Sequence, residues 1–144
     1  MSASIIFTSP MFLELQSSPI TSDWILADQP RASSRLISQS KNGNSYVMVW
    51  ECTAGQFNWN YTEDETVVIV DGEVFITVNA NAERRLGSGE TAFFPAGTSC
   101  KWRIPDRVRK VAVLQKPIPR PVYLALRVYY KILQKLKGNG ERTL

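Results

Sequence analysis

The middle of the chain alternates apolar and polar positions with the period of two that β-strands show. From Tyr46 to Gln115 the apolar runs are short, separated by Gly, Pro and acidic residues, and almost free of helical periodicity. This pattern predicts about eight short strands, as in an antiparallel sandwich or barrel. Asp71-Gly72, between TVVIV and EVFITV, predicts a tight hairpin turn because glycine adopts positive φ at little cost.

The two ends of the chain have different patterns. Residues 1–45 are rich in Ser and turn signals, and predict an N-terminal extension with short strands and a possible dimer arm. Residues 46–116 form the predicted barrel, and residues 117–144 form a Pro-rich linker and an amphipathic helix over 122–137. At about 100° per residue, Arg127, Lys131 and Lys135 share one stripe and the apolar side chains lie opposite.

Composition changes this picture in three ways. The 144 residues are enough for one domain with a core, and the N-terminus lacks the basic region of a signal peptide, so we expect a cytoplasmic protein. The net charge of +4 is concentrated in the tail, because seven basic residues and one acid follow from Lys116 onward. Only two cysteines are present, too few for a disulfide framework.

Two motifs carry a family resemblance. Gly89-x5-Pro95-x-Gly97-x2-Cys100 resembles the second cupin motif, which normally ends in histidine, and Glu65-x6-Gly72 resembles the end of the first. A wider pattern reads W-x-Y-x-E-D-E-x6-G from Trp59 and G-x-G-E-x4-P-A-G-x4-W from Gly87. It resembles small single-domain cupins related to the C-terminal cupin of (S)-ureidoglycine aminohydrolases and to the ethanolamine-utilisation cupin. This resemblance implies an all-β, RmlC-like jelly-roll β-barrel, here with an added C-terminal amphipathic helix. It also implies a homodimer and a pocket inside the barrel mouth.

The candidate site follows from these motifs. The places of the first motif's two histidines fall on Trp59 and Tyr61, which share parity with Glu65 along an extended chain. We expect these three side chains, with Cys100 and Phe93, to contact a ligand. A buried Glu65 would be desolvated unless a cation pairs with it, and Arg103 or Arg109 is the expected partner.

A metal centre is not expected at this site. Cupin metal sites normally use three imidazoles and one carboxylate, whereas this sequence contains no histidine. One Glu and one Cys are fewer than the three protein ligands of catalytic zinc. We therefore predict that the protein has neither a metal nor another cofactor.

Three classes of function remain open. The leading hypothesis is a metal-free cupin that binds a small organic molecule in the barrel pocket. The second is an enzyme with Glu65 as general base and Tyr61 as acid, acting on a small carbonyl or ureido compound. The third is a structural or adaptor protein that acts through the basic helix, with Cys100 and the aromatic residues serving only as core.

The helix itself has three possible partners. We favour packing of its apolar face on the barrel or on a partner subunit, with subunits pairing through edge strands. An anionic membrane surface at 122–137 is a less favoured alternative. The basic residues lack a known DNA- or RNA-binding motif, and no nucleic acid partner is predicted.

Overall fold

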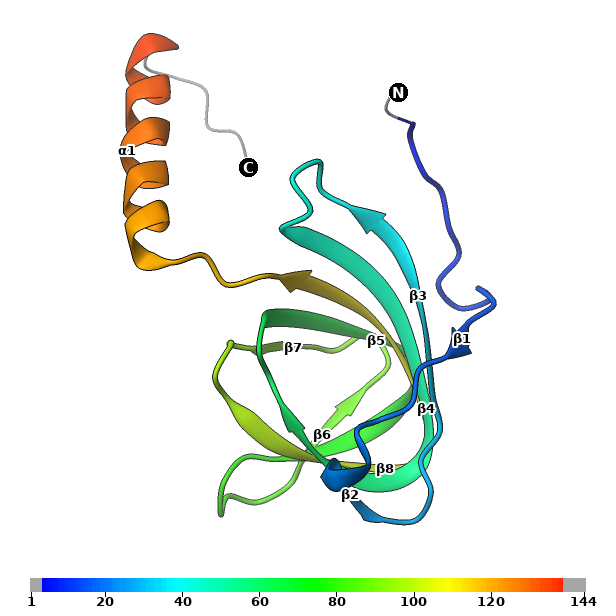
Figure 1. Ribbon diagram of the computed structural model, residues 1–144. Helices are drawn as coiled ribbons and strands as arrows, with labels where there is room; N and C mark the ends of the chain where they lie inside the picture. Colours follow the sequence, from blue (N-terminus) through cyan, green and yellow to red (C-terminus); the bar gives the residue numbers. More distant parts are fainter. Residues whose placement is uncertain (1–3, 139–144) are drawn as a thin grey trace.

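A computed structural model describes residues 4–138 and shows antiparallel strands curved into a barrel, with one helix that projects from it (Figure 1). The polypeptide forms a predominantly β jelly roll with a C-terminal helix, as the sequence predicts. In chain order, the elements are β1 (Gln16–Ser17), the 3-10 turn η1 (Ser22–Trp24), β2 (Ile25–Ala27), β3 (Ala32–Gln39), β4 (Ser45–Asn60), β5 (Asp64–Thr77), β6 (Arg84–Gly87), β7 (Thr91–Phe94), β8 (Ser99–Gln115) and α1 (Arg120–Leu136).

Three long strands make the barrel wall. The strand order is β1-β3-β4-β8-β5-β6, with β2 paired to β4 and β7 paired to β5. β8 is central, pairing with β4 from Ser45↔Gln115 to Asn60↔Ser99 and with β5 on its other side. The register shifts within both ladders, and such irregularities bend strands. β4, β5 and β8 therefore each extend along more than one side of the barrel.

The hairpin predicted at Asp71-Gly72 is wrong. Both residues lie inside β5, which continues through them and pairs with Arg109 and Val108 of β8. Gly72 does adopt a positive φ of 78°, but a Cβ there would lie 1.9 Å from the Arg107 carbonyl oxygen. The glycine therefore marks an irregularity in β5 where the paired strand β8 lies too close for a side chain. Local sequence does not distinguish this use of Asp-Gly from a hairpin turn.

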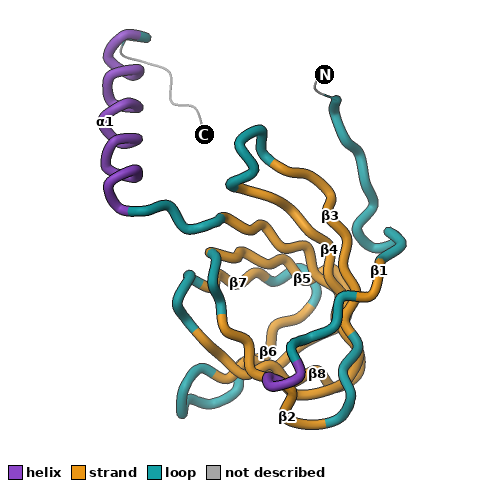
Figure 2. Tube along the Cα trace, viewed as in Figure 1, coloured by secondary structure: helices purple, strands orange, loops and turns teal. Residues whose placement is uncertain are grey.

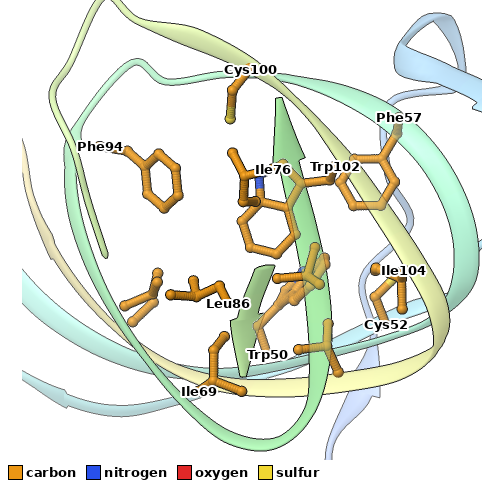
Figure 3. Close-up of a cluster of buried hydrophobic side chains, with 14 of the residues drawn as sticks. Trp50, Cys52, Phe57, Ile69, Ile76, Leu86, Phe94, Cys100, Trp102 and Ile104 are labelled. Carbon is orange, nitrogen blue, oxygen red and sulfur yellow. The ribbon is translucent and has the colours of Figure 1, made fainter. Parts of the chain in front are cut away.

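Side-chain alternation places one face of each long strand in the core. Along β8, even-numbered residues from Cys100 to Ile104 and from Val108 to Ala112 are buried, whereas their odd-numbered neighbours are half-buried or exposed. The same cluster includes large side chains from β4, β5, β6 and β7 (Figure 3). Five of its seventeen buried residues are aromatic, and Trp102 and Phe57 are the largest fully buried residues.

The strands expected before residue 46 are present and belong to the same sheet. β3 pairs with β4 from Ala32↔Cys52 to Gln39↔Tyr46, and β1 pairs with β3. The Arg109 guanidinium donates hydrogen bonds to the carbonyl oxygens of Pro10 at 2.8 Å and Leu13 at 3.0 Å, which ties the preceding segment to the barrel. A role of this segment as a dimer arm stays a prediction.

α1 follows a short Pro-containing linker and stands apart from the strands (Figure 2). It begins at Arg120, two residues before the predicted start, and none of its residues is buried. The arrangement in which the helix packs on its own barrel is therefore wrong, and packing on a partner subunit stays a prediction. No helix of residues 4–138 is long and apolar enough to cross a membrane.

Candidate functional site

Three consecutive acids at the start of β5 each take a different partner. Glu63 accepts a hydrogen bond from the Tyr46 hydroxyl of β4. Asp64 Oδ1 accepts one from the backbone N–H of Ala96 at 2.8 Å, in the turn between β7 and β8. Glu65 points into the barrel and is 5% exposed. This short segment therefore forms hydrogen bonds with β4 and with the β7–β8 turn, and it directs the Glu65 carboxylate into the barrel.

Glu65 is paired with a buried lysine. Lys110 Nζ of β8 lies 2.7 Å from Glu65 Oε2, and the two residues are 4% and 5% exposed. A buried charge of either sign lowers stability unless it is paired, so each of these two groups offsets part of the free-energy cost of burying the other. Arg103 and Arg109, the partners expected from sequence, instead pair with Glu83 and Glu51, and that expectation is wrong.

Tryptophan rings surround the lysine ammonium. Lys110 Nζ lies 4.6 Å from the ring centre of Trp50, 4.7 Å from that of Trp102 and 6.0 Å from that of Trp59. The faces of aromatic rings attract cations, and the attraction is strongest where water is excluded. Figure 3 shows Trp50 and Trp102 inside the barrel. The centre of this barrel therefore holds an ammonium group from its own chain.

Tyr61 lies beside this pair and is held by hydrogen bonds at both backbone and side chain. Its backbone N–H donates to the Thr98 carbonyl at 2.9 Å, and its carbonyl accepts from Gly97 at 2.7 Å. Its hydroxyl accepts from Trp102 Nε1 at 3.1 Å and from the Cys100 thiol at 3.9 Å. The ring stacks on Phe94 with 4.6 Å between centres. Burial raises the pKa of Tyr61 well above its usual value, so the hydroxyl is neutral.

A small pocket of about 190 Å³ opens next to Glu65 and Tyr61. Aromatic side chains provide much of its wall, and two carboxylates contribute charge. No Lys or Arg side chain lines it. Its lining is Trp24, Tyr46, Trp59, Asn60, Tyr61, Thr62, Glu63, Glu65 and Leu114.

Three of the five predicted ligand-contacting residues meet at this pocket. Trp59, Tyr61 and Glu65 line it together. Cys100 is buried and lines a neighbouring pocket of about 450 Å³, which shares Trp24 and Asn60 with the first pocket. Phe93 is 59% exposed on the outer face of β7, so its expected place in the pocket is wrong. Its neighbour Phe94 points inward, because successive residues of a strand face opposite sides.

The cysteines are unsuited to nucleophilic chemistry. Both thiols are free and buried. Burial raises the pKa of Cys52 to about 12 and also raises the pKa of Cys100. Because the thiolate is the reactive form, a raised pKa suppresses reactivity. These residues act as small side chains that fill the core.

The donor set around Glu65 does not fit a cupin metal. Residues 4–138 contain no cluster of three or more potential ligands among His, Cys, Asp and Glu. The position next to the one retained carboxylate is taken by Lys110, and a protonated ammonium has no lone pair for a metal. Trp59 and Tyr61 stand where the motif normally has imidazoles. The absence of a bound metal in the working protein remains a prediction.

Sequence reasoning missed Lys110 and two of the three tryptophans around it, Trp50 and Trp102. A usable signal was present, since Lys110 shares parity with Val108 and Ala112 on an apolar-alternating strand. A lysine on the inward face of a barrel needs a buried acid as its partner. Glu65 is predicted to point into the same interior, so the two residues could have been paired from sequence. Trp50 shares parity with Cys52 on β4 in the same way.

Comparisons with known proteins agree with this fold. The family model described as the EutQ-like cupin domain matches residues 39–112. This chain therefore belongs to the EutQ-like cupin family. No curated protein matches the sequence.

Solved structures show the same architecture at low identity. A protein of unknown function of the DUF861 family from Pseudomonas syringae superposes with a TM-score of 0.66 at 20% identity, over 72% of this chain and 45% of that one. The EutQ protein of Clostridium difficile gives 0.53 at 21%, over 60% and 63%. The Cnp3 cupin domain of Schizosaccharomyces pombe gives 0.59 at 13%, over 79% and 71%. The chain thus spans less than two thirds of the first two proteins, and these likenesses establish the fold alone.

Proposed function

We propose that this protein is a metal-free cupin that binds a small organic molecule in the pocket beside Glu65. The observation that carries the proposal is the lining of that pocket, in which Trp59, Tyr61 and Glu65 converge on one opening. Small-molecule sites combine apolar and aromatic walls with a few polar groups that fix orientation, as here. Membership of the EutQ-like cupin family supports a role in small-molecule binding or a related enzyme-like role.

The pocket favours a small ligand that donates hydrogen bonds. Its volume of about 190 Å³ lies below the usual range for drug-sized ligands, so it suits a molecule of about ten non-hydrogen atoms or fewer. The carboxylates of Glu63 and Glu65 accept hydrogen bonds, and the aromatic walls attract cations. The Glu65 charge is balanced by Lys110, whereas Glu63 takes part in no salt bridge within residues 4–138, so its charge repels anions. A cationic or neutral N–H compound is therefore preferred over a carboxylate of equal shape.

The Glu65–Lys110 pair weighs against the enzyme hypothesis. A general base must take up a proton, and protonation of Glu65 would leave the buried Lys110 ammonium, 2.7 Å from Glu65 Oε2, without its charge partner. The raised pKa of Tyr61 makes its hydroxyl a weak acid but leaves it a hydrogen-bond donor. Acid–base catalysis by these two residues stays an untested alternative to binding.

Three probes of equal shape and different charge test the proposal. Benzamidinium, benzamide and benzoate would be titrated into the ¹⁵N-labelled protein and followed by amide chemical shifts. We expect benzamidinium to bind best and benzoate worst, with shifts concentrated around residues 59–65. Absence of binding by all three, or preference for benzoate, would overturn the proposal.

A pair of variants on β8 separates pocket binding from surface binding. Leu114→Trp places a larger side chain in the pocket without removing a polar group. Val113→Trp is the matched control, because Val113 is 43% exposed on the opposite face of the same strand. Leu114→Trp should abolish the shifts at 59–65 and Val113→Trp should preserve them.

A further inference from the structure

We infer that α1 binds flat on an anionic membrane surface, with its apolar face in the lipid and its basic face toward the headgroups. This surface lies outside the barrel pocket and does not depend on the function proposed for it. The inference rests on the sidedness of the helix, on its charge and on its isolation from the barrel.

The helix has one broad apolar face and one narrow basic face. On a wheel of about 100° per residue, Arg120, Arg127, Lys131 and Lys135 fall within a narrow sector. The opposite, wider sector is apolar and contains Val122, Tyr129, Ile132 and Leu136, which are 50%, 55%, 52% and 78% exposed. Tyr123, Tyr129 and Tyr130 add amphipathic rings of the kind that sit at a membrane–water interface.

This apolar face needs a cover from outside the chain. None of the residues of α1 is buried, and Figure 1 shows the helix separated from the barrel. An isolated helix of this length is marginally stable in water, because most helical stability in proteins comes from packing of the apolar face. A partner that contacts this face therefore also stabilises the helix.

The charges favour lipid over a second copy of this chain. Residues 116–138 carry six basic side chains and no acid, so the same segment of a second copy supplies no acidic side chain to pair with them. Salt bridges within residues 4–138 already engage six of the twelve acidic side chains in these residues, which halves the number available to a basic helix: Glu51, Glu65, Asp71, Glu73, Glu83 and Glu90. Anionic headgroups supply the missing negative charge.

The N-terminal segment strengthens this inference. Ile5, Phe7 and Phe12 are 85%, 90% and 86% exposed. Figure 1 places this segment and α1 toward the same end of the barrel. Both groups of apolar side chains are therefore exposed to an external surface, whereas no helix of the described residues can span a bilayer.

Co-sedimentation of the full chain with vesicles tests the inference. One vesicle set contains phosphatidylcholine only, and the other contains about one third phosphatidylserine, a lipid that attracts basic segments. We expect binding to the second set only, weakened by added salt and accompanied by increased helical circular dichroism. Equal binding to both sets, or to neither, would overturn the inference.

Variants identify the surface responsible. The triple change Arg127→Gln, Lys131→Gln and Lys135→Gln should weaken binding about a hundredfold, since each basic residue contributes roughly a fivefold factor at an anionic surface. The control, Arg31→Gln with Lys41→Gln and Arg84→Gln, removes the same charge from exposed positions outside α1 and should leave binding nearly unchanged. Equal losses in both triples would show general attraction of a basic protein and would count against α1.

A dimer is the competing outcome. Ile132→Gln with Leu136→Gln keeps the helix charge and should weaken vesicle binding by about tenfold for each residue. Sedimentation velocity of the wild-type and this variant provides the second readout. If the wild-type is a dimer that this variant dissociates, and vesicles are not bound, then a second copy covers the helix and the inference is wrong.

Discussion

The barrel interior and α1 handle positive charge in opposite ways. Inside the barrel, one lysine is fully enclosed, paired with Glu65 at 2.7 Å and surrounded by tryptophan rings. On α1, four basic side chains lie in solvent on a helix without a single acid. A buried charge must be neutralised by the fold itself, whereas exposed charges cost little and remain available to an external partner.

This difference indicates that the buried ion pair contributes to the stability of the fold, whereas α1 presents a surface that its own barrel does not cover. Removing a group from the interior leaves a partner unpaired in a place that water does not reach. Removing a group from α1 leaves nothing unpaired. Substitutions in the two regions should therefore differ strongly in their effect on the free energy of unfolding.

The largest expected effect comes from breaking the buried ion pair. Lys110→Met should lower the free energy of unfolding by about 3–5 kcal/mol, because it leaves the Glu65 carboxylate buried and unpaired. Urea denaturation measures the change. The matched control is Lys101→Met on the same strand, a half-buried position, which should cost about 1 kcal/mol or less.

A double variant sharpens this prediction. Glu65→Leu combined with Lys110→Met removes both charges and should recover much of the lost stability, because buried pairs replaced by apolar residues are often neutral. If the double variant is less stable than Lys110→Met alone, the pair is not the reason for the loss.

A smaller loss is expected at the rim of the barrel. Asp64→Ala removes the acceptor of the Ala96 N–H and should cost about 1.5–3 kcal/mol, the range for hydrogen bonds to charged groups. Thermal unfolding checks this value. Asp106→Ala is the control because Asp106 is an exposed acid on β8, and a similar loss there would contradict a specific role of the hydrogen bond.

The next effect depends on pH. Burial raises the pKa of Cys52 from 9.0 to about 12, so the unfolded thiol ionises first as pH rises. Below pH 9 the thiol contributes its full stability, and between pH 9 and about 12 stability falls by at most about 1.4 kcal/mol per pH unit for this group. Cys52→Ala should reduce that slope, measured by denaturation at several alkaline pH values.

The cavity left by Cys52→Ala lowers stability by an amount that does not depend on pH. A constant offset from the wild-type with an unchanged slope would therefore show that the thiol does not account for the alkaline loss.

The smallest effect is expected on α1. Arg127→Gln, Lys131→Gln and Lys135→Gln together should change the free energy of unfolding of the barrel by about 0.5 kcal/mol or less, because these exposed residues contact no buried group. Urea denaturation monitored by tryptophan fluorescence reports on the barrel, whose core contains the tryptophans. A loss comparable to that of Lys110→Met would show that the helix supports the barrel and would break the comparison.

Much of the fold could be predicted from local pattern. Period-two alternation indicated the strands, the Gly89–Cys100 spacing indicated a cupin, and the sidedness of 122–137 indicated the helix. These signals work because burial repeats every two residues in a strand and about every 3.6 in a helix. The prediction of a hairpin turn at Asp71-Gly72 is wrong because a tight bend within a strand and a hairpin both place glycine at positive φ.

The site was predicted only in part for a similar reason. Trp59, Tyr61 and Glu65 line one pocket, and sequence could place them on one face because they lie close together in an extended segment with alternating sides. Phe93 was misplaced by one position on a four-residue strand, which moves a side chain to the opposite face. Lys110 was missed because it is 45 residues from Glu65, and its pairing depends on the register between β5 and β8.

The sequence by itself determined the strand and helix types, the charge of the tail and the lack of histidine ligands, since each is local or compositional. Tertiary structure alone decided which cation pairs with Glu65, which aromatic rings surround that cation and how large the adjacent pocket is. It also decided that α1 does not pack on its own barrel. The physical reason is distance along the chain. Local preferences fix how each segment is shaped, but strand register and closure of the barrel fix which segments meet.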